Sequence, residues 1–236
     1  MNLIDRENYQ NSCLVVGNSR WHWAFQKIKE WEFFDTSIKN EILKALDVPL
    51  RAWAAVGPIP KNIQLDNNAQ KIELEDIPLL RMPSWLGIDR ALASWGAFKK
   101  AKELSLLHRN GILVADAGTV LSITKISAKG EFAGGQLSAG LHLQLKAMNE
   151  WTQHLSYPLK TDIPKEKFPV LTADAMKKGS LNSLIGSLMQ AQADAEAPIW
   201  LCGGDSEIIF NSISNEKVEA HLHPNLVLEG MINIIK

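Results

Sequence analysis

The chain has 236 residues, enough for one large domain or for two domains of about 100 to 120 residues each. Apolar residues make up 46% and charged residues 22%, a composition that excludes a disordered or collagen-like protein. With 25 basic and 26 acidic residues the net charge is −1, so no overall positive field favours a nucleic acid or an anionic membrane as partner.

The first predicted elements are two strands joined by a tight turn. The apolar run 13–16 stops at Gly17-Asn18-Ser19, and a second run follows at 21–25. Residues 36–46 place apolar side chains at helical spacing with Thr36 as the cap, so they predict a helix. A short buried strand is expected over 52–56, and the apolar pattern of 89–107 predicts a second helix.

After Asn110-Gly111 the pattern starts again. Residues 112–115 form an apolar run that leads into Asp116-Ala117-Gly118-Thr119, and 120–126 follows as another strand. This order repeats that of residues 13–25, which indicates a weak internal duplication at a spacing of about a hundred residues. We therefore expect two domains, 1–111 and 112–236.

The rest of the second half continues the alternation of helices and strands. Gly134-Gly135 is expected to open a segment that becomes helical through Leu141, Leu145 and Met148, and 172–188 predicts a further helix. Residues 199–202 predict a strand, Gly203 to Ser206 a turn, and residues 226–230 lead into a short final helix.

The turn Gly17-Asn18-Ser19 is the first candidate binding motif. A glycine after a buried strand lets the backbone approach a ligand closely, and the Asn and Ser side chains offer hydrogen-bond donors to a phosphate. Arg20 adds a positive charge. The same residues also suit an ordinary hairpin turn, because Asn and Gly favour turns for conformational reasons.

Two aspartates are the candidate functional acids. Asp116 ends an apolar strand before Gly118 and Thr119, where a carboxylate can hold a cation and the turn can bind phosphate. Asp89 opens the helix 89–107 next to Arg90. Each has an alternative: Asp116 as a turn former, and Asp89 as an acid favoured by the helix dipole.

The spacing of cysteines and histidines predicts whether the chain binds zinc, and its hydropathy predicts whether it enters a membrane. Cys13 and Cys202 are far apart and, like the six histidines, lack zinc-ligand spacing, so the cysteines are expected to be buried thiols in a reducing compartment. The N-terminus has no signal-peptide pattern, and no stretch approaches the roughly 18 apolar residues of a membrane span. We expect a cytoplasmic protein with no membrane partner.

The order of these motifs resembles the type III pantothenate kinases over nearly the whole chain. The matching segments are VGNSR (16–20), PSWLGIDRALASWGA (83–97), VADAGTVLSIT (114–124), GGQLSAGLHLQLKAM (134–148), TADAMKKGS (172–180), CGGDS (202–206) and PNLVLEGM (224–231). The resemblance implies an α/β fold of two ribonuclease-H-like domains, with mixed sheets flanked by helices, in the actin-like ATPase and sugar-kinase superfamily. It also implies a homodimer that transfers the γ-phosphoryl group of ATP to pantothenate in coenzyme A synthesis, with Mg²⁺ and a monovalent cation, K⁺ or NH₄⁺.

The resemblance also implies roles for individual residues. It makes Asp89 the catalytic base and Asp116 the ligand of the monovalent cation. The implied pantothenate-binding residues are Gly87, Ile88, Asp89, Arg90 and Thr172, the last lying near the dimer interface. The implied ATP-binding residues are Gly17, Asn18, Ser19, Arg20 and Thr119.

Three positions depart from the family pattern. Val15 stands where the first phosphate motif has its leading Asp, Leu80 where a Tyr is usual, and Thr124 where the second phosphate strand ends in Asp. Two other functions therefore stay open. One is a non-catalytic accessory or regulatory member of the family, which the departures favour. The other is a related kinase acting on another small alcohol or acid.

Overall fold

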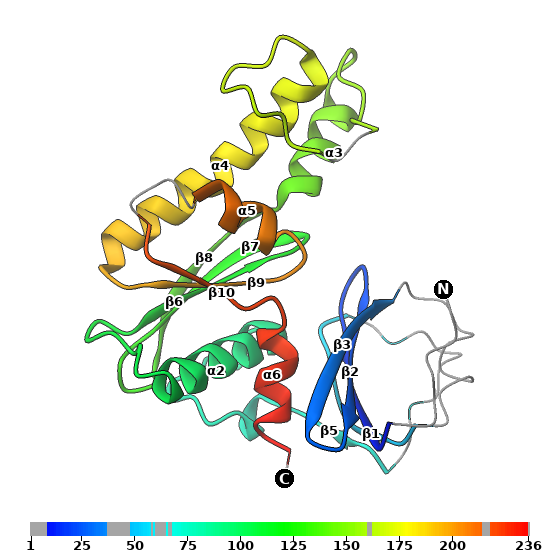
Figure 1. Ribbon diagram of the computed structural model, residues 1–236, viewed down its shortest axis with the longest axis vertical. Coiled ribbons are helices and arrows are strands. Elements are labelled where there is room, and N and C mark those ends of the chain that lie inside the picture. The colour runs from blue at the N-terminus through cyan, green and yellow to red at the C-terminus, as the bar shows by residue number, and fades with distance from the viewer. Residues whose placement is uncertain are drawn as a thin grey trace. The chain divides into compact units, whose positions relative to one another are not determined.

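The computed structural model describes residues 9–36, 48–57, 59, 65, 68–159, 162–213 and 218–235 (Figure 1). The helix predicted over 36–46 lies outside these residues apart from Thr36, which is the last residue of strand β3 (Glu30–Thr36). Within the described ranges, every helix is too short or too polar to cross a membrane.

The chain forms two compact units. Unit 1 comprises Met1–Glu103 and Asn225–Lys236, and unit 2 comprises Leu104–Pro224. These units differ from the predicted ranges 1–111 and 112–236 chiefly because helix α6 (Leu226–Ile232) packs against α2 (Ile88–Glu103). The helices meet at two glycines: a Cβ on Gly96 would lie 2.4 Å from a backbone oxygen of α6, and one on Gly230 would lie 2.0 Å from one of α2.

Unit 1 contains a five-stranded mixed sheet in the order β3-β2-β1-β4-β5. Its strands are β1 (Asn11–Val16), β2 (Trp21–Lys27), β3, β4 (Leu50–Ala55) and β5 (Gln70–Lys71). The first three pair antiparallel, whereas β4 is parallel to β1 and β5 is parallel to β4. Alternate side chains such as Leu14, Trp23 and Phe25 form an aromatic-rich core on one face. Helix α6 contacts β1, and α2 contacts β4.

Unit 2 repeats this topology. Its strands are β6 (Ile112–Ala117), β7 (Val120–Ile126), β8 (Phe132–Ala139), β9 (Ile199–Cys202) and β10 (Ala220–Leu222), in the order β10-β9-β6-β7-β8. The strand directions match those of unit 1 pair by pair. The internal duplication and the predicted class, two mixed sheets flanked by helices, are therefore confirmed.

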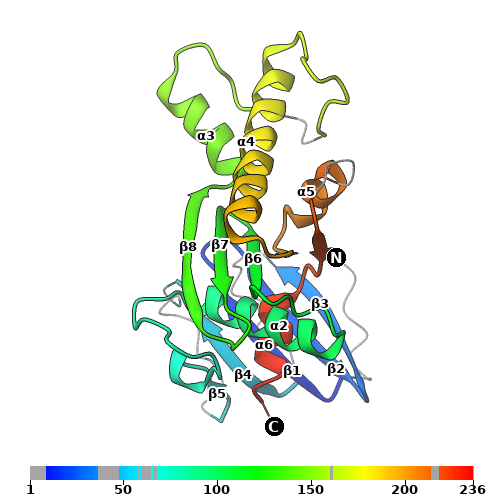
Figure 2. The ribbon, with the colours of Figure 1, turned by 90° about the vertical axis from the view of Figure 1, so that its left-hand side faces the viewer.

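Three helices complete unit 2: α3 (Leu141–Trp151), α4 (Thr172–Ala195) and α5 (Ser206–Ile213). Figures 1 and 2 show α3 and the first half of α4 beyond the end of the sheet, while the second half of α4 lies along it. Leu184, Leu188 and Ala191 of α4 join the core formed with β6, β7 and β9.

Some element boundaries differ from those predicted. The helix predicted through Leu141, Leu145 and Met148 is confirmed as α3, but the Gly134-Gly135 pair before it lies inside β8. Gly134 has a φ of +102°, and the pairing of β7 with β8 shifts register nearby, so the glycines allow a strand irregularity. Helix α2 ends at Glu103 rather than 107, and Ser105, two residues beyond this end, has a left-handed φ of +58°. Helix α4 continues past 188 to Ala195.

Both cysteines are expected to resist alkylation in the folded protein. Cys13 and Cys202 have no exposed surface and form no disulfide. Burial raises the pKa of the Cys13 thiol to about 12, so the reactive thiolate is scarce even in mildly alkaline buffer. Mass spectrometry after iodoacetamide treatment should find no label on the native protein and two labels after denaturation in guanidinium chloride. Rapid labelling of the native protein would contradict this burial.

Candidate functional site

The hairpin between β1 and β2 presents polar groups at the end of the unit 1 sheet. The Gly17 N–H donates to the Arg20 carbonyl at 3.0 Å, which closes the turn, and residues 18–20 are exposed. A Cβ on Gly17 would lie 2.7 Å from that same carbonyl oxygen, so only glycine fits without a shift. The Asn18 side chain reaches Gly57, where a Cβ would lie 2.9 Å from its Oδ1.

The turn Gly87-Ile88-Asp89-Arg90 begins α2. The Asp89 carboxylate is half-buried and accepts the Arg90 backbone N–H at 2.8 Å. It folds back over Gly87, where a Cβ would lie 2.6 Å from Oδ1, so the glycine makes room for the acid. Burial lowers the pKa of the Arg90 guanidinium, and Asp89 acts in the opposite direction.

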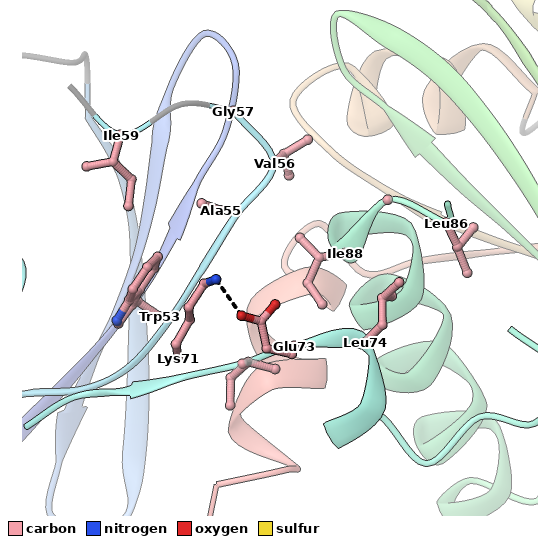
Figure 3. Close-up of a pocket in the computed structure, with 12 residues that line it drawn as sticks. Trp53, Ala55, Val56, Gly57, Ile59, Lys71, Glu73, Leu74, Leu86 and Ile88 are labelled. Atoms are coloured by element: carbon pink, nitrogen blue, oxygen red, sulfur yellow. Dashed lines mark ion pairs between the residues drawn. The ribbon is translucent and has the colours of Figure 1, made fainter. Parts of the chain in front are cut away.

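A hollow of about 420 Å³ in unit 1 is lined by Gly87 and Ile88 of this turn, and by Gly57, which the Asn18 side chain approaches. Figure 3 shows Val56 and Gly57 from the end of β4 on one side and Leu86 and Ile88 of the α2 turn on the other. Lys71 and Glu73 form an ion pair between these walls. Asn18 of the phosphate-type turn lies against Gly57, and Asp89 lies against Gly87, so each approaches a glycine that lines this hollow.

The hairpin between β6 and β7 is the unit 2 counterpart. Asp116 lies half-buried two residues before Gly118, and Thr119 is exposed at the turn. Gly203, with a φ of +88°, lies against this strand end: a Cβ there would be 2.4 Å from the Asp116 carboxylate and 2.7 Å from the Ala117 carbonyl oxygen. A carboxylate oxygen and a carbonyl oxygen, both of the type that binds hard cations, therefore lie close to this glycine.

Two residues beside this strand end received no role from the sequence. The Asp205 N–H donates to the Ala117 carbonyl at 2.9 Å, and the Asp205 carboxylate lies 4.0 Å from His142 Nε2. The His142 Nδ1 is in turn 2.8 Å from the Tyr157 hydroxyl. The CGGDS motif carries Asp205, but sequence spacing could not show that β9 and β6 are neighbours.

Val15 cannot supply the magnesium ligand that the family resemblance places at its position. Val15, at the position of the family aspartate, is 2% exposed and offers no oxygen ligand. Across the part of the chain that the structure describes, no three His, Cys, Asp or Glu side chains gather as a metal site. The other two departures are an exposed Leu80 and a buried Thr124.

Thr172 begins α4 in unit 2. It is exposed and follows a segment whose apolar side chains face solvent. The predicted site residues of unit 1 thus lie on the first hairpin and the α2 turn, and those of unit 2 at the end of β6 and the beginning of α4.

Comparisons with known proteins decide the family. A family model described as type III pantothenate kinase matches residues 64–193. A type III pantothenate kinase of Thermosynechococcus vestitus is 32% identical over 220 residues, which cover 88% of this chain and 82% of that protein. The chain belongs to the type III pantothenate kinase family. A second member of the family, from Synechococcus elongatus, is 27% identical over 92% of this chain and 93% of its own length.

Solved structures support the fold of this type III pantothenate kinase family member. A protein of Campylobacter jejuni described as a Baf family transcriptional activator has a TM-score of 0.63 and 21% identity, covering 95% of this chain and 96% of that one. The activator of 2-hydroxyisocaproyl-CoA dehydratase from Clostridium difficile, with bound ADPNP, has a TM-score of 0.52 and 11% identity, covering 96% and 92%. The predicted actin-like ATPase fold is confirmed.

Proposed function

We propose that this kinase transfers the γ-phosphoryl group of ATP to pantothenate and forms 4'-phosphopantothenate, the first step of coenzyme A synthesis. Family membership supports the reaction. The structural observation that supports it best is the α2 turn, where the Asp89 carboxylate lies next to Arg90 and folds over Gly87, a residue that lines the unit 1 hollow. Phosphoryl transfer asks the protein mainly to place these groups around the reacting atoms.

The acceptor side of the hollow carries the proposed acid–base residue. Asp89 accepts the proton of the pantothenate hydroxyl as it attacks, while Gly87 and Ile88 wall the acceptor. The Arg90 guanidinium pairs with the pantothenate carboxylate through charge-assisted hydrogen bonds, which hold the far end of the substrate. The lowered pKa of Arg90 reflects burial and leaves it charged at neutral pH.

The two hairpins carry the proposed ATP contacts. Backbone N–H groups and side chains of Gly17, Asn18, Ser19 and Arg20 bind phosphate oxygens, and Thr119 of unit 2 adds a hydroxyl donor. Because Val15 supplies no carboxylate, Mg²⁺ arrives with ATP and keeps its waters. Asp116 and the Ala117 carbonyl hold the monovalent cation, K⁺ or NH₄⁺.

The proposed location is the cytoplasm. ATP, the phosphoryl donor, is available there, and the two buried cysteines without a disulfide agree with a reducing compartment.

The proposed active form is a homodimer with Thr172 near its interface. The segment between α3 and α4 exposes large apolar side chains, and such a cluster is typical of a surface that another protein covers. These are Trp151, Leu159, Phe168, Val170 and Leu171, with exposed fractions from 68% to 100%. Leu181 and Leu184 of α4 pack in the core of their own unit, whereas Ala175 is exposed.

Sedimentation velocity at micromolar concentration should therefore show a dimer. We expect Phe168→Glu to shift the protein toward monomer, because a charge cannot be buried unpaired in an apolar interface. The matched control is Ile28→Glu, which also replaces an exposed apolar side chain by a carboxylate, but in unit 1. This variant should leave the dimer intact. A wild-type monomer, or a dimer unaffected by Phe168→Glu, would contradict the interface.

A binding or regulatory role is the second candidate. Val15 in place of the family aspartate favours it, as does the fold likeness to the Campylobacter jejuni protein described as a transcriptional activator. A third candidate is a kinase for another small alcohol or acid. Offering ATP with pantothenate, acetate or common sugars separates the three. We expect ADP release with pantothenate; release with another acceptor would favour a related kinase, and release with none an accessory protein.

A further inference from the structure

A row of side chains crosses the first hairpin at the point where the family aspartate is missing. Val15 on β1 pairs with His22 on β2, and His22 pairs with Asp35 on β3. Directly opposed residues of a sheet share one face. The corresponding row of unit 2 begins with Asp116, which, like Val15, lies two residues before the glycine of its hairpin. In unit 1 the carboxylate of this row is that of Asp35 on β3, two strands away from Val15 on β1.

Short contacts hold this carboxylate to two cationic groups. His22 Nδ1 lies 2.6 Å from Asp35 Oδ1, and an Arg20 guanidinium nitrogen lies 3.8 Å from Asp35 Oδ2. The hydrogen bond to His22 is the main cause that lowers the pKa of Asp35. An ionised carboxylate can only accept hydrogen bonds, so Nδ1 of His22 carries the proton and donates it.

The other ring nitrogen of His22 faces the phosphate-type turn. A Cβ placed on Gly17 would lie 3.3 Å from His22 Nε2, so the edge of the ring lies against the backbone of this glycine. The His22 side chain is 38% exposed, which leaves the edge open to a ligand. Among the residues that the structure describes, Nδ1 of this ring has a hydrogen-bond partner and Nε2 has none.

We propose that His22 is a phosphate-contacting residue of the ATP site: with both ring nitrogens protonated, it donates Nδ1–H to Asp35 and Nε2–H to a phosphate oxygen held at the Gly17 turn. The inference rests on the proposed function, which places ATP at this turn. Asp35 acts as a positioning residue that fixes the ring, and Arg20 lies beside it.

Charge explains why such a residue is needed here. A family aspartate would bring Mg²⁺ to the phosphates, but Val15 cannot. The Arg20 guanidinium, which lies beside Asp35, adds a positive charge at the turn. Charge-assisted hydrogen bonds to the phosphates then act where Val15 provides no metal ligand.

The same strand pair supplies a matched control. Lys27 and Glu32 form an ion pair of 2.6 Å at the opposite end of β2 and β3, away from the Gly17 turn. If the contact between His22 and Asp35 only stabilises the pairing of β2 with β3, Glu32→Gln and Asp35→Asn should have the same effects on stability and nucleotide affinity. If it orients His22 toward a phosphate, only Asp35→Asn should affect nucleotide affinity.

The test is calorimetric binding of a non-hydrolysable ATP analogue to the full-length protein without acceptor, together with steady-state kinetics and thermal melting. We expect His22→Ala to weaken analogue binding about 10-fold and to raise the KM for ATP similarly, with little change in the KM for pantothenate. Asp35→Asn should weaken binding less, His22→Gln should retain part of it through its amide donor, and Glu32→Gln should bind like wild type.

Wild-type analogue affinity in folded His22→Ala would overturn the proposal. So would an equal loss of ATP and pantothenate affinity accompanied by a lower melting temperature, because that pattern marks a structural role. Failure of the proposed function gives a different result: the wild-type protein would bind the analogue through His22 but would not phosphorylate pantothenate.

Discussion

Asp89→Asn should lower kcat about 10²-fold or more, as expected for the loss of a positioned base. The amide keeps an oxygen that can accept the Arg90 N–H, now at 2.8 Å, so the start of α2 should stay intact. ATP affinity should change little. Arg90→Ala should behave differently and mainly raise the KM for pantothenate, because it removes the partner of the substrate carboxylate.

Steady-state kinetics of folded variants check this pair of results. Asp194→Asn, the same change on an exposed part of α4, is the control and should keep wild-type turnover. If Asp89 served only the helix dipole, Asp89→Asn would cost about 0.5 to 1 kcal/mol of stability and little activity. Wild-type turnover in folded Asp89→Asn would remove this residue from the mechanism.

Asp116→Asn should abolish activation by monovalent cations and lower turnover about 10-fold or more, the usual range when a group that organises a metal site is lost. Its carboxylate and the Ala117 carbonyl converge beside Gly203, and replacing the carboxylate by a neutral amide removes the charge that would hold the ion. The wild-type protein should turn over faster in potassium or ammonium chloride than in a Tris-only buffer of equal ionic strength.

Melting temperature gives a second measurement that does not depend on activity. An ion that binds only the folded protein raises its stability, so potassium should raise the melting temperature of the wild type relative to Tris and should leave Asp116→Asn unchanged. Equal turnover of the wild type in both buffers would contradict a cation at Asp116.

The sequence was sufficient to predict both hairpins and the duplicated fold. Apolar strands that end at Gly17 and at Asp116 mark the same point in each sheet, since each run is buried and each turn is polar. The pattern of β9, four buried apolar residues followed by Gly203-Gly204, was equally clear. These elements are short, buried and bounded by turn residues, which is where periodicity is most informative.

Elements at the sheet edges were missed. Strand β3 reads as Glu-Trp-Glu-Phe-Phe-Asp-Thr and lies at the edge, where charged residues are tolerated and the apolar alternation is weak. Strand β10 has three half-buried residues. The packing of α6 against α2 depends on contact between Gly96 and Gly230. These glycines are far apart in the chain, so local patterns could not reveal the packing.

Some residues of the candidate site could be predicted from local sequence patterns, and others could not. Asp116 stands out in sequence because it ends an apolar strand before a glycine turn, and Asp89 because it opens a helix next to Arg90 in a motif that resembles the family. Asp205 and His22 did not, because their positions depend on which strands are neighbours: Asp205 reaches Ala117 across β9 and β6, and His22 reaches Asp35 across β2 and β3. Pairing of strands is a tertiary property that single-sequence patterns do not encode.

Direct detection of the product tests the central claim. Purified wild-type protein, incubated with ATP, Mg²⁺, K⁺ and pantothenate, should yield 4'-phosphopantothenate by mass spectrometry, in amounts that match ADP release. Asp89→Asn, prepared identically, should yield about 10²-fold less, which excludes a contaminating kinase. No phosphorylated pantothenate from the wild type, or equal amounts from both proteins, would contradict the assignment of this chain as a pantothenate kinase that uses Asp89.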